Sequence, residues 1–302
     1  MRITRRGFVA GAAAGVAAGA GLPLRALAEI SLGGARLTTV SDGHLMLPGS
    51  FVFEGLPEAE VAAIVEPMGV SPSALEPPCN VTLLRMGDRV VLFDVGAGPD
   101  FMPSAGELAA NLDAAGVAPE DVTDVIFTHA HPDHIWGLLD DFDEPLFPEA
   151  NYMMGRAEWD YWWNPETVDS IAAERQAHAV GAKRRMEVIE DRVKRFDDGE
   201  ELLPGLAAVA SFGHTPGHMS FELRAGSESV MILGDSINNH HVSFAKPGWE
   251  INADQDPALA AATRVGLMDR LAAEQMTVVG FHLPGGIGRA EKDGAGYRWV
   301  AM

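Results

Sequence analysis

The chain is poor in cysteine and in basic residues. Its single cysteine, Cys79, excludes an internal disulfide, and we expect this thiol to behave as a small buried apolar side chain. Lysine and arginine together number 22, against 43 acidic residues, which gives a net charge of −21. Such an acidic surface repels phosphate backbones and anionic lipids. The composition therefore argues against nucleic-acid binding and against attachment to anionic membranes.

Residues 1–28 differ in kind from the rest of the chain. The pair Arg5-Arg6 precedes an Ala/Gly-rich stretch that ends at Ala26-Leu27-Ala28, a pattern that resembles a twin-arginine export signal. The alternative is a membrane anchor, but Pro23, Arg25 and the many glycines disfavour a stable span, so we expect no span after removal of the signal. The sequence thus predicts a periplasmic protein. Loss of these residues, which hold four arginines and no acid, would take the net charge from −21 to −25.

The remaining residues, 29–302, suit one α/β domain without internal repeats. Two apolar runs around Gly87-Asp88 predict a hairpin of strands 81–86 and 89–94. Residues 156–195 form a charged helical pattern, with expected breaks at Asn164-Pro165 and at Gly181. The other expected elements are helices at 58–66, 102–115 and 257–274, and strands at 122–127, 206–210, 220–223, 230–233 and 277–281.

The segment from Thr128 to His134 gathers three histidines and an aspartate directly after an apolar strand. Imidazole and carboxylate groups are ligands for zinc and similar divalent cations, and a loop at a strand end can aim several of them at one point. A solvated polar turn is the alternative, but four ligand-type side chains in one short loop have no purpose without a cation. The segment predicts a metal site.

The motif His129-x-His131-x-Asp133-His134 resembles the signature of the metallo-β-lactamase-fold hydrolases. Three later segments resemble that family's other metal segments in the same order, namely Gly213–His218, Leu233–Ser236 and Phe281–Pro284. The layout is most similar to the methyl parathion hydrolase and acyl-homoserine lactonase branches. The resemblance implies a four-layer αβ/βα sandwich in a single domain; the alternation of strands and helices alone gives only a layered α/β fold.

The resemblance also implies which side chains hold two divalent cations. One cation would be held by His129, His131 and His214, the other by Asp133, His134 and His282, and Asp235 would bridge them. Zinc suits these ligands, and cobalt, manganese and iron are compatible with them. A shared hydroxide would be the nucleophile, with Asp133 as ligand and proton acceptor. Asn238 stands where lactonases of the family often carry a tyrosine, and its amide can also donate a hydrogen bond to the substrate.

The resulting hypothesis is a dinuclear metal hydrolase that cleaves an organophosphate triester, a lactone or a carboxylic ester. Its substrate would be a neutral, partly apolar small molecule. An acyl-homoserine lactonase comes next, followed by a glyoxalase II-like thioesterase or a β-lactamase. The thioesterases usually carry a basic C-terminal region that binds glutathione, and this sequence has no such region. Some β-lactamases carry a cysteine where this sequence has Asp235. A glutamate typical of diiron redox members is replaced by His131, and a noncatalytic metal-binding module would have lost ligands that are present here. The family also suggests a homodimer.

Several residues near the motifs leave alternatives open. We expect Asp94 to orient the metal loop, and His218 either to do the same or to be a core histidine. His240 and His241 suggest a rim position, and His44 and His178 suggest no role in the site. An aromatic group comprising Phe51, Phe53, Trp159, Trp162 and Trp163 could line a substrate pocket, although the tryptophan spacing is also typical of a helix packed in a core.

Overall fold

The computed structural model describes residues 28–302. The expected export signal lies outside these residues apart from Ala28, so it stays a prediction. Among the described residues, no helix combines the length and the apolar character needed to cross a bilayer.

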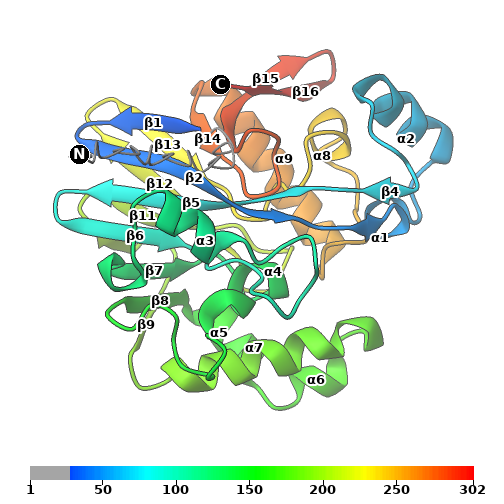
Figure 1. Ribbon diagram of the computed structural model, residues 1–302. Helices are drawn as coiled ribbons and strands as arrows, with labels where there is room; N and C mark the ends of the chain where they lie inside the picture. The colour runs from blue at the N-terminus through cyan, green and yellow to red at the C-terminus, as the bar shows by residue number, and fades with distance from the viewer. Residues whose placement is uncertain (1–27) are drawn as a thin grey trace, which may run out of the picture.

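Two seven-stranded sheets form the centre of the fold (Figure 1). The first has the order β1-β2-β5-β6-β7-β8-β9 and the second the order β10-β11-β12-β13-β14-β15-β16. Neighbouring strands are antiparallel except for the pairs β6·β7, β7·β8, β8·β9 and β13·β14. The strands are β1 (Glu29–Leu32), β2 (Ala35–His44), β5 (Pro78–Met86), β6 (Arg89–Phe93), β7 (Asp124–Phe127), β8 (Asn151–Gly155), β9 (Val193–Phe196), β10 (Glu201–Leu203), β11 (Leu206–Ala210), β12 (Met219–Ala225), β13 (Glu228–Ile232), β14 (Thr277–Val279), β15 (Ile287–Asp293) and β16 (Gly296–Ala301).

The central strands bury both faces, as their continuous apolar runs require. On β6, Val91 and Phe93 pack into the core between the two sheets, whereas Leu92 points to the opposite face. On β13, Val230 and Ile232 face the same inter-sheet core and Met231 faces outward. Because side chains alternate along a strand, each sheet presents a second apolar face that helices must cover.

Helices cover both outer faces. The first sheet carries α3 (Leu108–Ala114), α4 (Pro132–Ile135), α5 (Arg156–Trp163), α6 (Thr167–Ser170) and α7 (Gln176–Ile189), and the second carries α9 (Pro257–Ala273). Figure 1 shows α5 to α7 below the sheets and α9, in orange, between β14 and α8. The expected four-layer sandwich is thereby confirmed.

A smaller unit lies beside the sandwich. It consists of β3 (Leu47–Pro48), α1 (Ser50–Phe53), α2 (Glu58–Val65), β4 (Ala74–Leu75) and α8 (Val242–Ala245). Their apolar side chains form a separate cluster that joins the N-terminal segment to residues near Ile251 and Ala253. This cluster fixes the N-terminal segment over the ends of the strands where the metal segments begin.

Most expected elements are present, but the expected helix at 102–115 begins late, at Leu108. The carboxylate of Asp42 accepts hydrogen bonds from the backbone N–H groups of Ala97 (2.7 Å) and Leu108 (2.8 Å). Gly106 has a φ of +86°, and its backbone packs on the carbonyl of Gly98. These tertiary contacts hold residues 100–106 as turns, which a local pattern does not reveal.

The helical region at 156–195 also differs from expectation. The break at Asn164-Pro165 is present between α5 and α6, but α7 continues through Gly181, and Val193 to Arg195 belong to strand β9. A Cβ atom at Gly181 would lie 2.4–2.6 Å from ring atoms of Trp136. Gly181 therefore brings α7 against the segment that follows the metal loop instead of interrupting the helix.

The contact between Gly181 and Trp136 predicts an unusual response to alanine. Alanine normally stabilises a helix, so Gly266→Ala on α9, where nothing lies within 4 Å, should raise the free energy of unfolding by about 0.5–1 kcal/mol. Gly181→Ala should instead lower it by about 1–3 kcal/mol, because the Trp136 ring is held by Phe101 and Arg185. Urea denaturation of both variants in the same metal state is the measurement. A gain in stability for both would contradict this packing.

Candidate metal centre

The first metal loop is built by a strand end and one turn of helix. Strand β7 ends at Phe127, and Pro132 then opens the short helix α4, which carries Asp133 and His134. Proline suits this position because its fixed φ matches the first turn and its missing N–H would be unpaired there. His129 and His131 thus leave the strand end, while Asp133 and His134 leave the helical turn, and all four are buried.

The structure brings the first expected ligand set together. Nδ1 of His131 lies 3.1 Å from Nε2 of His129 and 2.9 Å from Nε2 of His214. His214 comes from a loop 83 residues away from His131 in the chain, between β11 and β12. Three ring nitrogens so close together, each able to offer a lone pair, match the donor set of a nitrogen-rich cation site.

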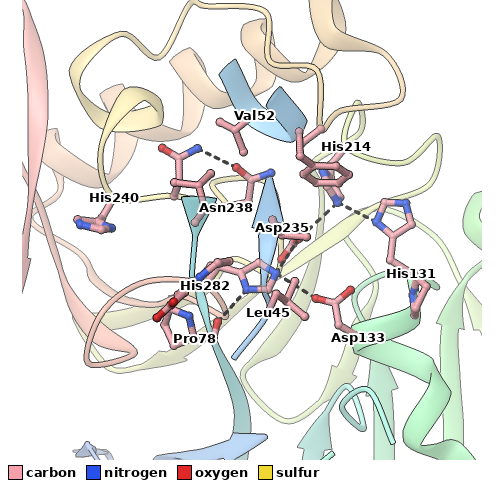
Figure 2. A pocket seen from close by; sticks show the side chains of 18 of the residues that line it. Leu45, Val52, Pro78, His131, Asp133, His214, Asp235, Asn238, His240 and His282 are labelled. Atoms are coloured by element: carbon pink, nitrogen blue, oxygen red, sulfur yellow. Dashed lines mark hydrogen bonds and ion pairs between the residues drawn. The ribbon is translucent and has the colours of Figure 1, made fainter. Parts of the chain in front are cut away.

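The second expected set lies next to the first, and Asp235 lies between them (Figure 2). Nε2 of His282 is 3.1 Å from Oδ2 of Asp133 and 3.3 Å from Oδ2 of Asp235. Oδ1 of Asp235 is 3.3 Å from Nε2 of His134, and its Oδ2 is 3.4 Å from Nε2 of His214. The carboxylate of Asp235 therefore reaches side chains of both sets, as a bridging ligand must.

Several of these atoms have no hydrogen bond that would account for their burial. Within the described part of the chain, Asp133 Oδ2, His134 Nε2 and Asp235 Oδ1 are buried without a hydrogen-bond partner. A buried polar atom without a partner costs roughly 1–3 kcal/mol, and more when it is charged. Buried nitrogen and oxygen atoms that converge on one place, some of them without a hydrogen-bond partner, fit a pair of divalent cations, so the side chains present are suited to the dinuclear site of the resemblance.

The electrostatics of the cluster agree with metal binding. Burial lowers the pKa of His129 and His131 well below the usual histidine value, so both rings are neutral and can act as ligands. Burial also disfavours charge on His134, but Asp133, Asp235 and Asp94 outweigh it and raise the pKa of His134 well above that value. Binding of a cation to His134 therefore competes with protonation of its ring.

Asp94 orients the first metal loop, as expected from its place after β6. It adopts a φ of +67° and accepts hydrogen bonds from Thr128 N and Thr128 Oγ1, each 2.8 Å long. Its Oδ2 also lies 2.8 Å from Nδ1 of His134, and the Thr128 hydroxyl lies 2.9 Å from Nδ1 of His129. Because these contacts occupy Nδ1 of both rings, Nε2 of each ring is the nitrogen left for a cation.

A second buried carboxylate, Asp254, does the same for His214. Its Oδ1 lies 2.9 Å from Nδ1 of His214, and Arg264 on α9 donates to its Oδ2 over 3.2 Å. The side-chain amide of the next residue, Gln255, lies 3.1 Å from Nε2 of His131. These residues lie in the loop before α9 and in α9 itself, so the second helical layer fixes His214 and also contacts His131 of the first metal loop.

Glu158 on α5 joins the two main metal loops. Its Oε1 accepts hydrogen bonds from Ala130 N (2.9 Å) and Trp162 Nε1 (2.6 Å). Its Oε2 accepts from Thr215 Oγ1 (2.6 Å) and Gly217 N (3.1 Å). Burial raises the pKa of Glu158, and the four donors act in the opposite direction.

The sequence analysis did not predict the roles of Glu158, Asp254 and Arg264, because a single acidic or basic residue in a charged helix or loop belongs to no motif.

Of the two roles considered for His218, the structure supports a positioning role and not that of a core histidine alone. Its Nε2 accepts a hydrogen bond from the backbone N–H of Asp235 over 2.9 Å, and its Nδ1 pairs with Ser211 Oγ over 2.8 Å. Gly234 must be glycine here, because a Cβ atom would lie 2.7 Å from His218 Nε2. The histidine therefore holds the backbone of the bridging residue.

Cys79 is fully buried in the core, as expected, but it also lies beside the second ligand set. Its sulfur lies within 4.8 Å of ligand atoms of Asp133 and His282. Burial raises the pKa of Cys79 to about 11, so the thiol is protonated at neutral pH.

An apolar pocket of about 240 Å³ opens onto the ligands. Figure 2 shows Asp133, His214, Asp235 and His282 around its inner end, with Asn238 on one side and His131 on the other. The apolar part of its wall comes mainly from the N-terminal segment and comprises Leu45, Leu47, Phe51, Val52, Val70, Leu75 and Phe101.

The pocket corrects several expectations. Phe51 lines it, but Trp159 and Trp162 are buried in the helix-covered core, Trp163 packs against that core, and Phe53 lies in the cluster beneath α2. His178, to which no role was assigned, lines the pocket from α7, together with His240 and His241 from the loop after Asp235. Helical spacing cannot tell a core tryptophan from a pocket tryptophan, and His178 precedes no motif. Burial lowers the pKa of His178.

Comparison with known proteins identifies the class. Residues 75–269 match the Metallo-beta-lactamase superfamily, which is more than half of the chain, and the protein therefore belongs to this superfamily. The matched region contains every expected ligand except His282, and the cluster of histidines and aspartates is the superfamily's dinuclear metal site.

The individual relatives share limited sequence identity with this chain. N-acyl homoserine lactonase AttM of Azorhizobium caulinodans is 28% identical over 127 residues, which cover 41% of this chain and 44% of the relative. Metallo-beta-lactamase domain-containing protein 1 of Xenopus laevis is 34% identical over 157 residues, covering 52% and 53%. The chain spans between 44% and 66% of the length of the curated relatives it matches.

Two solved structures cover nearly the whole chain. The hydrolase AbOPH of the β-lactamase superfamily aligns with a TM-score of 0.84 and 28% identity over 91% of this chain and 97% of that one. AidC, a dizinc quorum-quenching lactonase in complex with an N-hexanoyl-L-homoserine product, aligns with the same TM-score and coverage at 25% identity.

The four hydrogen bonds of Glu158 predict that even an isosteric change is harmful. In Glu158→Gln, the amide NH₂ group must face N–H donors that the carboxylate now accepts, in either orientation of the amide. We expect the free energy of unfolding to fall by about 2–4 kcal/mol and the affinity for divalent cations to fall as well. Denaturation and metal titration against Glu187→Gln, an exposed change on α7, provide the comparison. A free energy of unfolding equal to that of the control would contradict the role of Glu158 in joining the two metal loops.

The position of Asp235 predicts a loss of metal without a loss of fold. The wild-type protein should bind two divalent cations per chain, and Asp235→Asn should bind fewer, because the amide offers one neutral oxygen where the carboxylate reaches both ligand sets. Elemental analysis after dialysis gives the stoichiometry, and circular dichroism checks the fold. Full retention of two cations by the folded variant would contradict a bridging role.

Proposed function

We propose that the protein is a dinuclear metal-dependent hydrolase of ester-type bonds and that a lactone is its substrate. The observation that carries this proposal is the ligand cluster at the inner end of an apolar pocket. Zinc is the cation we propose, supported by the histidine and aspartate donors and by the dizinc character of AidC. Lactones are the substrate class that the relatives AttM and AidC suggest.

The pocket supports a neutral substrate. Arg175 is the one lysine or arginine side chain in its described lining, and its guanidinium donates to the backbone carbonyls of Asn252 (3.0 Å) and Ala253 (2.9 Å). A guanidinium already engaged in this way has less to offer an anionic group. The apolar wall provides a surface for an alkyl or aryl group, which burial stabilises by about 25 cal/mol per Å².

The proposed chemistry assigns a task to each polar side chain at the inner end. Two divalent cations, when bound, would polarise the carbonyl of the ester and lower the pKa of the water that attacks it. Asp133 would accept a proton from that water and pass it to the leaving alkoxide, which closes the proton balance of ring opening. Asn238 would steady the carbonyl or the ring oxygen. Its Oδ1 accepts from Asn239 over 3.0 Å, and its Nδ2 donates to no described residue, so this N–H group is free for a substrate oxygen.

Three of the alternatives from the sequence fit this pocket less well than a lactone, and one fits it equally. An organophosphate triester is neutral and partly apolar, so it stays a prediction next to the lactone. A glutathione thioester is anionic and would find no unengaged lysine or arginine among the described pocket residues. A β-lactam of the usual carboxylate form meets the same difficulty. A noncatalytic role would leave the open pocket and the free amide of Asn238 without purpose.

Periplasmic location and homodimer formation also remain proposals. The twin-arginine-like segment before Glu29 supports export, and the acidic composition is compatible with a protein that binds neither nucleic acid nor anionic membranes.

A substrate panel tests the proposed function. The zinc-reconstituted protein should hydrolyse N-hexanoyl homoserine lactone with a higher kcat/KM than an aryl acetate or a paraoxon-like triester, and should leave a glutathione thioester and a penicillin essentially unchanged. Asp235→Asn serves as the matched inactive control. Turnover of the thioester alone, or of no ester by a protein that holds two cations, would overturn the proposal.

A further inference from the structure

His178 has features of a ligand-binding residue that the metal centre does not use. It lines the pocket from α7, and its ring centroid lies 5.9 Å from that of the expected ligand His131. Nδ1 of His178 is buried without a hydrogen-bond partner, and the described residues give its Nε2 none either. A histidine that faces a substrate pocket with both nitrogens unpaired is incompletely satisfied by the protein alone.

The burial of Nδ1 indicates which nitrogen carries the proton. A buried N–H group without an acceptor is rarer and more costly than a buried lone pair without a donor. The neutral ring therefore favours the tautomer with its proton on Nε2, which remains accessible. In this tautomer His178 offers an N–H donor to whatever occupies the pocket.

The surroundings of His178 favour an uncharged acceptor. Arg175 lies one turn before it, and the guanidinium of Arg175 is engaged by the backbone carbonyls of Asn252 and Ala253, which fixes this part of the wall in place. A second N–H donor, Asn238, lies on the other side of the ligand cluster from His131 (Figure 2). The pocket thus offers two neutral donors, one on each side of the position where the ester must lie.

We propose that His178 is a specificity-determining residue that donates a hydrogen bond to a carbonyl oxygen beside the scissile ester, so that the preferred substrate is a lactone bearing an amide. This inference rests on the proposed function and names the substrate class within it. Asn238 serves the lactone group and His178 the amide carbonyl, while the apolar wall formed by the N-terminal segment takes the acyl chain. A site built to hydrogen-bond a polar group rejects an analogue that lacks the group, because its own donor is then left unpaired.

Two matched lactones test the assignment. N-hexanoyl homoserine lactone carries the amide. In α-heptyl-γ-butyrolactone, two CH₂ groups replace the N–H and C=O groups of that amide, so the side chain has the same number of atoms in line. The wild-type zinc protein should prefer the amide lactone. His178→Phe, which keeps an aromatic ring but loses the N–H donor, should lower kcat/KM for the amide lactone about tenfold to a hundredfold, the loss expected for one such hydrogen bond. Its kcat/KM for the alkyl lactone should change less than about twofold, and His178→Gln should restore part of the preference.

The controls separate the possible failures. His44→Phe alters a half-buried histidine outside the pocket lining and should leave both substrates unaffected. An equal loss on both lactones in His178→Phe would mean a structural role and would overturn the assignment, as would an unchanged preference. Hydrolysis of neither lactone by wild-type protein with two bound cations would overturn the proposed function itself, and the assignment with it. Metal content and thermal unfolding of each variant confirm that the comparison is between equally loaded, folded proteins.

Discussion

The structure depends on the compensation of buried carboxylates. Asp94, Asp133, Asp235, Asp254 and Glu158 are all removed from solvent around one group of imidazoles. A carboxylate in such an interior is tolerated only when it is paired, hydrogen-bonded or coordinated. Asp94, Asp254 and Glu158 are hydrogen-bonded to protein donors, whereas Asp133 Oδ2 and Asp235 Oδ1 have no hydrogen bond and only ring nitrogens of His134 and His282 at ion-pair distance. Of these five acids, Asp133 and Asp235 are therefore the two whose carboxylates are left for cations.

This division explains the arrangement of layers around the site. Glu158 comes from a helix over the first sheet, and Arg264 comes from the helix over the second. Each acts on a metal loop that starts from a strand end, so the ligands are fixed from both outer layers as well as from the sheets. Ligands fixed in this way need little rearrangement when a cation binds, and fixed geometry of this kind is a main source of catalytic power in such sites.

The sequence predicts the parts of this arrangement that are local or repeated in a motif. The hairpin around Gly87-Asp88 and the strand before His129 follow from apolar runs and turn residues, and the ligand positions follow from the family resemblance. The late start of α3 depends on Asp42, which is 66 residues from Leu108, and the continuity of α7 through Gly181 depends on a ring 45 residues away. Contacts of this kind leave no periodic signal, and neither does a single buried acid such as Glu158.

The same reasoning shows where substrate choice is encoded. The ligand motifs supply only the inner end of the pocket, and their geometry serves many ester-type reactions equally well. The apolar wall comes mainly from the segment around Leu45 to Leu75, and polar lining residues come from helix α7 with His178 and from the loop after Asp235. These segments lie outside the metal motifs, so they can vary without disturbing the ligands. Differences in substrate between this protein and its relatives should therefore be sought in these three segments, and not in the histidines and aspartates that define the superfamily.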